Sequence, residues 1–147
     1  MNTNTIAEVT DLRGLVAAYT CVSRRDVRDY LMWMHLDTVT GIVTGTDGNR
    51  AAQAQVLRPS KNGTQFLWKP VCKPSVHSTR RAPMLMARGE KTLELRLAGK
   101  KICCGEHSTD PALMEPWRGI LEILTNLLDG RRYYRCDTVV ENFLANL

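Results

Sequence analysis

The chain has 147 residues, of which 44% are hydrophobic and 24% charged, enough for one globular domain with a sizeable core. No apolar run reaches the roughly 18 residues that a membrane-spanning helix requires, and the polar N-terminus does not resemble a secretory signal. We therefore expect a cytoplasmic protein that does not bind a membrane.

The net charge of +5 is distributed unevenly along the chain. Residues 48–101 hold 12 basic and two acidic side chains, whereas residues 1–47 and 102–147 both hold more acidic than basic side chains. A segment with one sign of charge indicates a polyanionic partner, most simply nucleic acid. The alternative is a solvated basic face that balances acidic surfaces elsewhere in the fold.

The cysteines and histidines show no pattern typical of a metal site or a disulfide framework. The chain has five cysteines without a C-x-x-C pair, and its three histidines are far apart. An odd cysteine count favours reduced thiols with a structural role. Glycine-rich phosphate loops, nucleophile motifs and metal-ligand spacings are also missing from the sequence. We therefore expect no metal, no cofactor and no enzyme activity.

The first third of the chain predicts a strand, a helix and a second strand. "IAEV" is typical of a short strand, and "TDLRGLVAAYTCV" of an amphipathic helix capped by Thr10 or Asp11. After the polar connection "SRRDVRD", "YLMWMHLDT" alternates as a strand with Leu31, Trp33 and His35 on one face.

A β-hairpin follows these elements. "GIVTGT" and "RAAQAQVL" predict its two arms, because the intervening dipeptide Asp47-Gly48 is typical of a tight turn. "QFLWKPV" predicts another short strand, which ends at Pro70. The strands predict an antiparallel sheet.

The second half predicts a further hairpin and further helices. A helix in "CKPSVHSTRRAPMLMARGE" stays open, because Pro74 and Pro83 would break it. "KTLELRL" alternates clearly and "KICCGE" returns beside it, whereas "STDPALMEPW" predicts a loop. "RGILEILTNLL" predicts a helix ended by Gly130, although it also fits the start of a strand. "RRYYRCDTVVENFLANL" repeats the strand–helix order of the N-terminus, which indicates the start of a second domain copy.

Two motifs in the first half resemble one protein family. "DVRDYL" (residues 26–31) is followed about twenty residues later by "TDGNR" (residues 46–50). Together they resemble the D-V-R-x-Y-L loop and the T-D-G-x-R-L hairpin in the middle domain of the bacterial DNA polymerase sliding clamp, the β-clamp. The resemblance implies an α+β fold, a single DNA-clamp-type domain over residues 1–125 with a curved antiparallel sheet backed by two helices. Residues 126–147 then resemble the strand and helix that begin the next clamp domain.

Two alignments of the second half with this family are open. In the collinear alignment, "TLELRLAGKKI" resembles the strand–turn–strand after the domain's second helix, and "EPWRGIL" resembles the exit segment. In the other alignment, "PWRGILEILTNLLDG" is the second helix and residues 58–110 are an insertion. We prefer the collinear alignment because it needs no large insertion.

The resemblance implies that the hairpin forms one wall of a peptide-binding cleft. In the family this cleft lies between the middle and last domains and captures short linear peptides, whose apolar anchors need apolar walls. The matching residues here are Leu31, Thr46, Gly48, Asn49, Arg50 and Ala51. Ala51 stands where the family often has Leu, and the opposite wall belongs to a domain that this chain largely lacks. The alternative is that these residues only close and pack the hairpin.

The resemblance also implies two segments that contact DNA phosphates. In clamps, the loop that matches "SRRDVRDY" lies near the DNA, and helices present basic side chains like those of "HSTRRAPMLMARGEK". The candidate DNA-binding residues are Arg24, Arg25, Arg28, Tyr30, Arg80, Arg81 and Arg88. Asp26 and Asp29 partly cancel the charge of the loop, so a solvated loop with local Arg–Asp pairs is the alternative.

The resemblance implies a clamp-like accessory protein of DNA replication or repair, a processivity factor whose compactness suggests a phage or mobile element. It would form a homo-oligomer or join a partner, contact DNA non-specifically and dock replication or repair proteins that carry clamp-binding peptides. A closed ring would need about six copies of a single domain or a partner that supplies the others. The first alternative is a regulatory or decoy adaptor that binds replication proteins without encircling DNA. The second is a nucleic-acid-binding or structural protein in which the hairpin is incidental.

Overall fold

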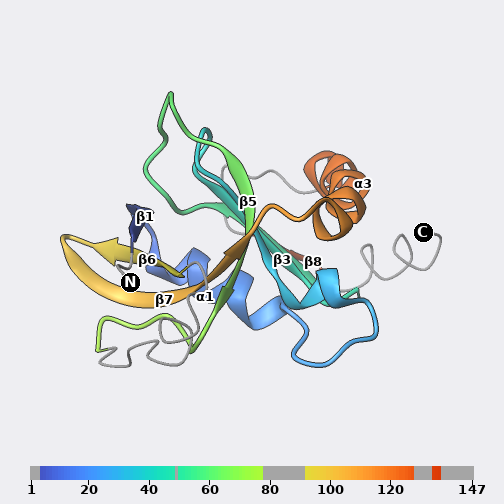
Figure 1. Cartoon of the computed structure of the whole chain (residues 1–147), viewed down its shortest axis with the longest axis horizontal. Coiled ribbons are helices and arrows are strands. Elements are labelled where there is room, and N and C mark those ends of the chain that lie inside the picture. The colour runs from blue at the N-terminus through green and yellow to red at the C-terminus, as the bar shows by residue number, and fades with distance from the viewer. Residues whose placement is uncertain (1–3, 49, 78–91, 128–133, 137–147) are drawn as a thin grey trace.

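The computed structural model of the chain describes residues 4–48, 50–77, 92–127 and 134–136, shown in colour in Figure 1. In chain order the elements are β1 (Asn4–Glu8), α1 (Leu12–Cys21), the 3-10 helix η1 (Asp29–Met32), β2 (Met34–Asp37), β3 (Ile42–Thr46), β4 (Ala51–Gln55), β5 (Gln65–Pro70), β6 (Thr92–Leu97), β7 (Lys100–Ser108), α3 (Pro111–Leu127) and β8 (Tyr134–Cys136). The prediction of an α+β fold is confirmed.

Within the described residues, eight strands form one sheet in the order β1-β6-β7-β5-β2-β3-β4-β8. Neighbouring strands are antiparallel except β1 and β6, which pair in parallel. The sheet curves where the long strand β7 turns from its pairing with β6 to its pairing with β5 (Figure 1). The predicted curved, largely antiparallel sheet with two helices is therefore present.

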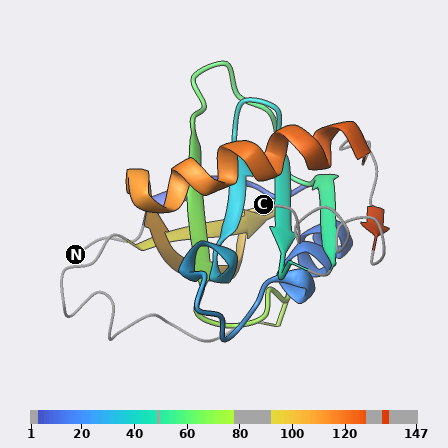
Figure 2. The same ribbon diagram turned by 90° about the vertical axis from the view of Figure 1, so that its right-hand side faces the viewer.

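The two helices cover opposite faces of this sheet. Side chains of successive strand residues point to opposite faces, and on β2 Met34 and Leu36 pack with Leu15 of α1. The intervening His35 points the other way, and its ring centroid lies 5.8 Å from that of Trp117 in α3. Figure 2 shows α3 running across the strands on its side of the sheet. The alternation predicted from the sequence is thus observed for residues 33–36, whereas Met32 packs against the same core as Leu31 and Trp33.

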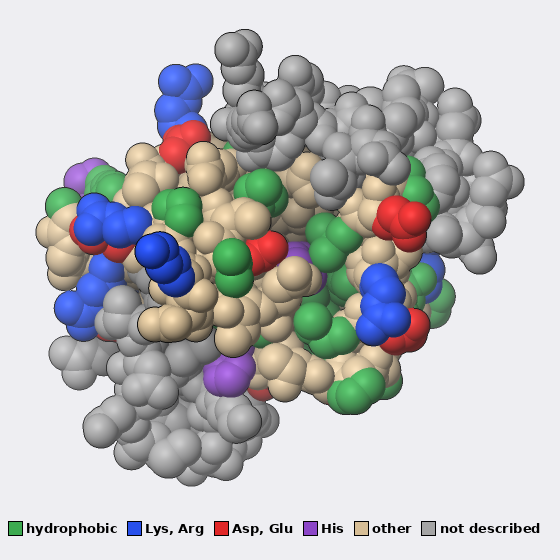
Figure 3. Space-filling model, turned by 90° about the horizontal axis from the view of Figure 1, so that it is seen from above, with side chains coloured by type: hydrophobic (Ala, Val, Ile, Leu, Met, Phe, Trp, Pro, Cys, Tyr) green, Lys and Arg blue, Asp and Glu red, His purple; other side chains and the backbone are tan. Residues whose placement is uncertain are grey.

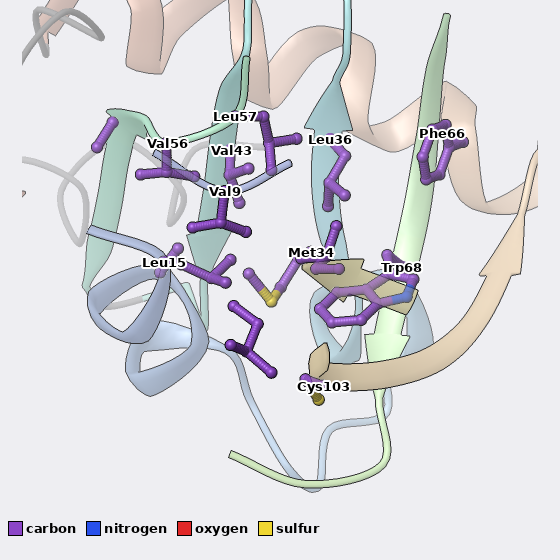
Figure 4. Packing of buried hydrophobic residues seen from close by; sticks show 14 residues of the cluster. Val9, Leu15, Met34, Leu36, Val43, Val56, Leu57, Phe66, Trp68 and Cys103 are labelled. Atoms are coloured by element: carbon purple, nitrogen blue, oxygen red, sulfur yellow. The ribbon is translucent and has the colours of Figure 1, made fainter. Parts of the chain in front are cut away.

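A cluster of buried hydrophobic side chains lies between α1 and the sheet. Figure 4 shows side chains from the central strands meeting Leu15 of α1 and Cys103 of β7. Its buried members are Val9, Leu15, Ala18, Met34, Leu36, Val43, Ala54, Val56, Leu57, Phe66, Trp68, Leu95, Ile102 and Cys103. Burying one large side chain of this kind contributes about 1.5–3 kcal/mol, so this cluster holds α1 and both ends of the sheet together.

A second, smaller core lies beneath α3. Its buried members are Leu31, Trp33, Ala51, Leu67, Leu113, Trp117, Ile120 and Leu124. The indole N–H of Trp117 also donates a hydrogen bond to the carbonyl oxygen of Tyr30 at 2.7 Å. This bond joins Tyr30 and Trp117, which are 87 positions apart in the chain.

The predicted start of α1 is confirmed. Asp11 is extended, and its side chain accepts a hydrogen bond from the backbone N–H of Gly14 at 3.1 Å. This bond satisfies one of the N–H groups that the first turn of a helix leaves without an intrahelical partner. Of the two predicted caps, Asp11 is the residue that caps the helix.

Two local predictions were wrong. Residues 111–117 belong to α3 and not to a loop, because Asp110 accepts a hydrogen bond from the N–H of Ala112 and Pro111 occupies the first helical position. Pro116 is accommodated inside the helix. Residues 29–32 form η1 and not the start of a strand. The predicted helices within residues 73–91 and 137–147 fall largely or entirely outside the described residues.

The tail after α3 contributes a strand to the same sheet. β8 pairs antiparallel with β4, with Ala51 opposite Cys136 and Gln53 opposite Tyr134. α3 itself runs to Leu127, across the predicted boundary at residue 125. Among the described helices, none is both long enough and apolar enough to cross a membrane.

Candidate functional site

The two motifs that are separate in the sequence meet in the folded chain. A Cβ atom placed on Gly48 would lie 3.0 Å from Nη2 of Arg28, so the guanidinium group lies directly against the hairpin turn. The loop that carries Arg28 is closed at its base by a backbone hydrogen bond from Ser23 to Leu31 at 3.1 Å. The loop at residues 23–31 and the turn at residues 46–50 therefore form one surface, which we call the loop–turn site.

The turn is held by its own side chains. Asp47 accepts a hydrogen bond from the backbone N–H of Arg50 at 2.8 Å. The hydroxyl of Thr46 donates to the carbonyl oxygen of Arg50 and accepts from the N–H of Gly48. Gly48 has a φ of +95°, in the region that favours glycine. Thr46, Asp47 and Gly48 thus each use their residue type to form the turn, as expected if these residues only close the hairpin, whereas Arg50 contributes backbone groups to these bonds.

Arg50 connects the turn to helix α1. Its guanidinium forms an ion pair with Asp47 at 3.4 Å and donates a hydrogen bond to the carbonyl oxygen of Thr20 at 3.1 Å. The last carbonyls of a helix lack intrahelical partners and carry partial negative charge, so a cation there is favourable. Arg50 is therefore engaged in holding the hairpin against α1.

The charge of Arg28 is balanced within the loop. Its side chain donates two hydrogen bonds to the carboxylate of Asp26, both at 3.1 Å. The hydrogen bonds from the Arg28 side chain and backbone lower the pKa of Asp26, and the Asp26 carboxylate in turn raises the pKa of Arg28. Both groups stay charged at neutral pH, and the pair as a whole is neutral.

The other loop residues are more open to solvent. Arg24 and Arg25 are exposed, and the Arg24 guanidinium carbon lies 5.8 Å from the ring centroid of Tyr19. Val27 is fully exposed at the tip of the loop, whereas Tyr30 is half-buried against the second core. The structure thus brings Arg24, Arg25, Arg28 and Tyr30 into one loop. Arg80, Arg81 and Arg88 lie outside the described residues.

Most residues of the predicted peptide-binding wall are covered. Leu31, Thr46, Gly48 and Ala51 are buried, and Arg50 is half-buried. Leu31 and Ala51 belong to the same core as Trp117 and Ile120 of α3, so α3 occupies the apolar surface of this wall. Asn49 lies outside the described residues.

A hollow lies beside the wall, between α3 and the sheet. It has a volume of about 820 Å³ and is visible in Figure 3. Its lining residues are His35, Asp37, Thr40, Ile42, Thr44, Gln53, Gln65, Met114, Trp117, Arg118, Leu121 and Glu122. We call it the α3 groove. This groove was not predicted from the sequence, although Thr44 and Gln53 interrupt the apolar pattern of the hairpin arms.

The floor of the α3 groove is polar. Strand pairing aligns His35 with Thr44 and Thr44 with Gln53 on the α3 face of the sheet. The amide of Gln53 donates to the Thr44 hydroxyl at 3.0 Å, while its buried oxygen has no hydrogen-bond partner among the described residues. Such a buried polar atom carries a desolvation cost of about 1–3 kcal/mol. A bound group that donates a hydrogen bond would remove this cost.

His35 is neutral at physiological pH. Burial lowers its pKa from 6.5 to about 4, against the smaller opposing effects of the Asp37 charge and a hydrogen bond with Gln65. The imidazole therefore acts as an uncharged hydrogen-bonding group. In the described part of the chain, no cluster of three or more His, Cys, Asp or Glu side chains forms a metal site.

The pKa of His35 predicts a pH-dependent stability. Below pH 6.5 the unfolded chain binds a proton at His35, while the folded chain binds it only near pH 4, so stability is lost as the pH falls through this window. We expect denaturant unfolding to show that the wild type loses about 2–3 kcal/mol more than His35→Gln between pH 7.5 and 4. His77→Gln, at an exposed position, is the matched control. Equal losses in wild type and His35→Gln would contradict this prediction.

The contact between Arg28 and Gly48 sets this chain's two motifs side by side. The chain has no significant match among models of protein families, curated protein sequences or solved structures. The loop–turn site and the α3 groove are two features of the described fold that offer a surface for a partner.

Proposed function

We propose that the chain is a DNA-clamp-like accessory protein of replication or repair, acting in the cytoplasm as an oligomer. The observation that carries the proposal is the packing of the Arg28 guanidinium against Gly48. The motifs at residues 26–31 and 46–50 resemble two clamp motifs individually, and their contact makes them one surface. Strands β2 and β3 pair antiparallel, so the loop before β2 and the turn after β3 lie at the same end of the sheet.

In this proposal DNA is bound by phosphate contacts that do not depend on sequence. Arg24 and Arg25 are exposed on the loop–turn site, and neither forms an ion pair within the described residues. Arginine donors of this kind bind phosphate oxygens, and affinity then falls steeply with salt. Arg28 contributes less, because Asp26 neutralises it.

Linear peptides of partner proteins are proposed to dock in the α3 groove. The groove is formed in part by β3 and β4, the strands of the predicted hairpin, through Ile42 and Gln53. Its apolar wall can receive hydrophobic anchors, and its uncharged floor can pair with peptide amides. A peptide in this groove would lie beside the predicted wall and not on it, because α3 covers Leu31 and Ala51.

The DNA proposal is tested by reversing the two exposed charges. We expect the double variant Arg24→Glu/Arg25→Glu to bind a short duplex at least about tenfold more weakly at low salt than the wild type. The slope of log affinity against log salt should fall in magnitude by about two, one for each lost phosphate contact. Fluorescence anisotropy over a salt series measures both quantities.

A charge-matched control is available elsewhere on the surface. Lys61→Glu/Arg118→Glu changes the net charge equally at two exposed positions that lie outside the loop–turn site. It should lower affinity only slightly and leave the salt slope nearly unchanged. Equal losses in both double variants would mean that net charge alone attracts DNA, and the proposed site would be wrong.

The adaptor that binds replication proteins without encircling DNA is the second candidate. The observation that favours it is the Asp26–Arg28 pair, which removes one positive charge from the loop. A ring assembly has a mass of several chains in solution, whereas an adaptor is a monomer or closed dimer. Analytical ultracentrifugation at low salt distinguishes them: a monomer without DNA affinity would eliminate the clamp proposal.

A further inference from the structure

Two cysteines that are distant in the sequence lie side by side at the end of the first core. Cys72 follows β5, Cys103 belongs to β7, and their sulfur atoms are 3.9 Å apart. The Cys103 thiol also donates a hydrogen bond to the carbonyl oxygen of Cys72 at 3.0 Å. Since the residues are 31 positions apart, this contact is created by the fold.

The backbone on both sides of Cys72 is fixed to β7. Val71 donates a backbone hydrogen bond to Cys104, and Ser75 donates one to Ile102, both at 3.0 Å. These bonds hold the Cys72 backbone beside Cys103. A disulfide has an S–S distance of about 2.05 Å, so the sulfurs, now 3.9 Å apart, would have to approach by roughly 2 Å.

We propose that Cys72 and Cys103 form a reversible, redox-active cysteine pair that hydrogen peroxide converts to an intramolecular disulfide. The two thiols differ in access: Cys72 is half-buried, whereas Cys103 is fully buried. Burial raises the pKa of Cys103, which keeps it a thiol. Cys72 is therefore the residue that the oxidant reaches first, and Cys103 is the resolving residue.

The reaction balances with one peroxide per pair. The Cys72 thiolate attacks one peroxide oxygen, an S–O bond forms, the O–O bond breaks, and the released hydroxide takes a proton to become water. The Cys103 sulfur then attacks the Cys72 sulfur, the S–S bond forms, and the hydroxyl leaves with the Cys103 proton as a second water. Two electrons pass from the two sulfurs to the peroxide, and an external dithiol reverses the change.

A basic segment of the chain lies between the two cysteines. Residues 73–102 lie between the two cysteines and contain eight of the chain's 20 Lys and Arg residues but only two acidic ones. The disulfide would join both ends of this basic segment covalently. Oxidation would thus enclose the part of the chain with the highest density of positive charge in a covalent loop.

The test is peptide mapping of the folded full-length chain after treatment with hydrogen peroxide. We expect the wild type to lose two free thiols per chain, to yield the Cys72–Cys103 cross-linked peptide and to recover both thiols with dithiothreitol. Cross-linking should be at least about tenfold faster in the folded chain than in urea, since the fold holds the sulfurs together. The oxidised form should melt roughly 5–10 °C higher than the reduced form.

Variants separate this pair from the other thiols. Cys72→Ser and Cys103→Ser should form no intramolecular cross-link, while Cys104→Ser, which removes the neighbouring buried thiol, should form it as the wild type does. If a variant does not fold, the peptide map of the oxidised wild type alone still tests whether Cys72 and Cys103 become cross-linked. A wild type that stays reduced, cross-links different cysteines, or cross-links equally fast in urea would overturn the proposal.

Discussion

Replacing Trp117 with Ala is expected to lower the free energy of unfolding by about 3–5 kcal/mol. The indole is fully buried in the core beneath α3, where it packs with residues of η1, β4 and β5 such as Leu31, Ala51 and Leu67. The substitution removes this packing and leaves a cavity. It also leaves the carbonyl oxygen of Tyr30 without the hydrogen bond that the indole donates.

Urea unfolding, followed by far-UV circular dichroism, measures the loss. Trp117→Phe separates the two effects, because it keeps most of the apolar volume and removes only the N–H donor. We expect it to cost about 1–3 kcal/mol, the penalty for one unsatisfied buried polar group. Arg118→Ala, at the exposed neighbouring position, should change stability by less than about 0.5 kcal/mol. A loss below about 1 kcal/mol for Trp117→Ala would show that α3 does not pack on the sheet as described.

Gly45→Ala is expected to destabilise the fold by about 3 kcal/mol or more, despite adding a single carbon atom. A Cβ atom at Gly45 would overlap the carbonyl oxygen of Ala18 and lie 2.9 Å from its carbonyl carbon. These are backbone atoms of α1, which cannot rotate away as a side chain does. Strand β3 and helix α1 would therefore have to separate, and the first core would loosen.

Gly119→Ala provides a matched control in α3. A Cβ atom there meets nothing within 4 Å, so the alanine adds no clash and raises helix propensity. We expect Gly119→Ala to stabilise the protein by about 0.5–1 kcal/mol. Thermal and urea unfolding of the two variants should therefore move in opposite directions. A neutral Gly45→Ala would mean that α1 does not approach β3 at this position.

The elements predicted correctly are those that short-range patterns define. The hairpin at Asp47-Gly48, the cap at Asp11 and the opposite faces of His35 and Leu36 each depend on residues within a few positions of one another. The start of α3 was missed because "STDPALMEPW" was interpreted as a loop, whereas Asp110 and Pro111 together begin a helix. Here the sequence held the signal, and the interpretation was wrong.

The candidate site was predicted less completely than the fold. The loop and the turn were each identified from their motifs, but their contact through Arg28 and Gly48 was not predicted. The burial of Leu31 and Ala51 under α3 was also not predicted. Both features depend on how elements far apart in the chain pack against one another.

The sequence by itself determined the order of most elements, the cap of α1 and the hairpin, because periodicity and turn chemistry act over a few residues, whereas the α+β class came from the family resemblance of two motifs. Only the tertiary structure decided which face each helix covers. It also aligned His35, Thr44 and Gln53 beneath α3, and it placed Cys72 beside Cys103. Strand register and packing create these contacts, and both depend on the free energy of the whole fold.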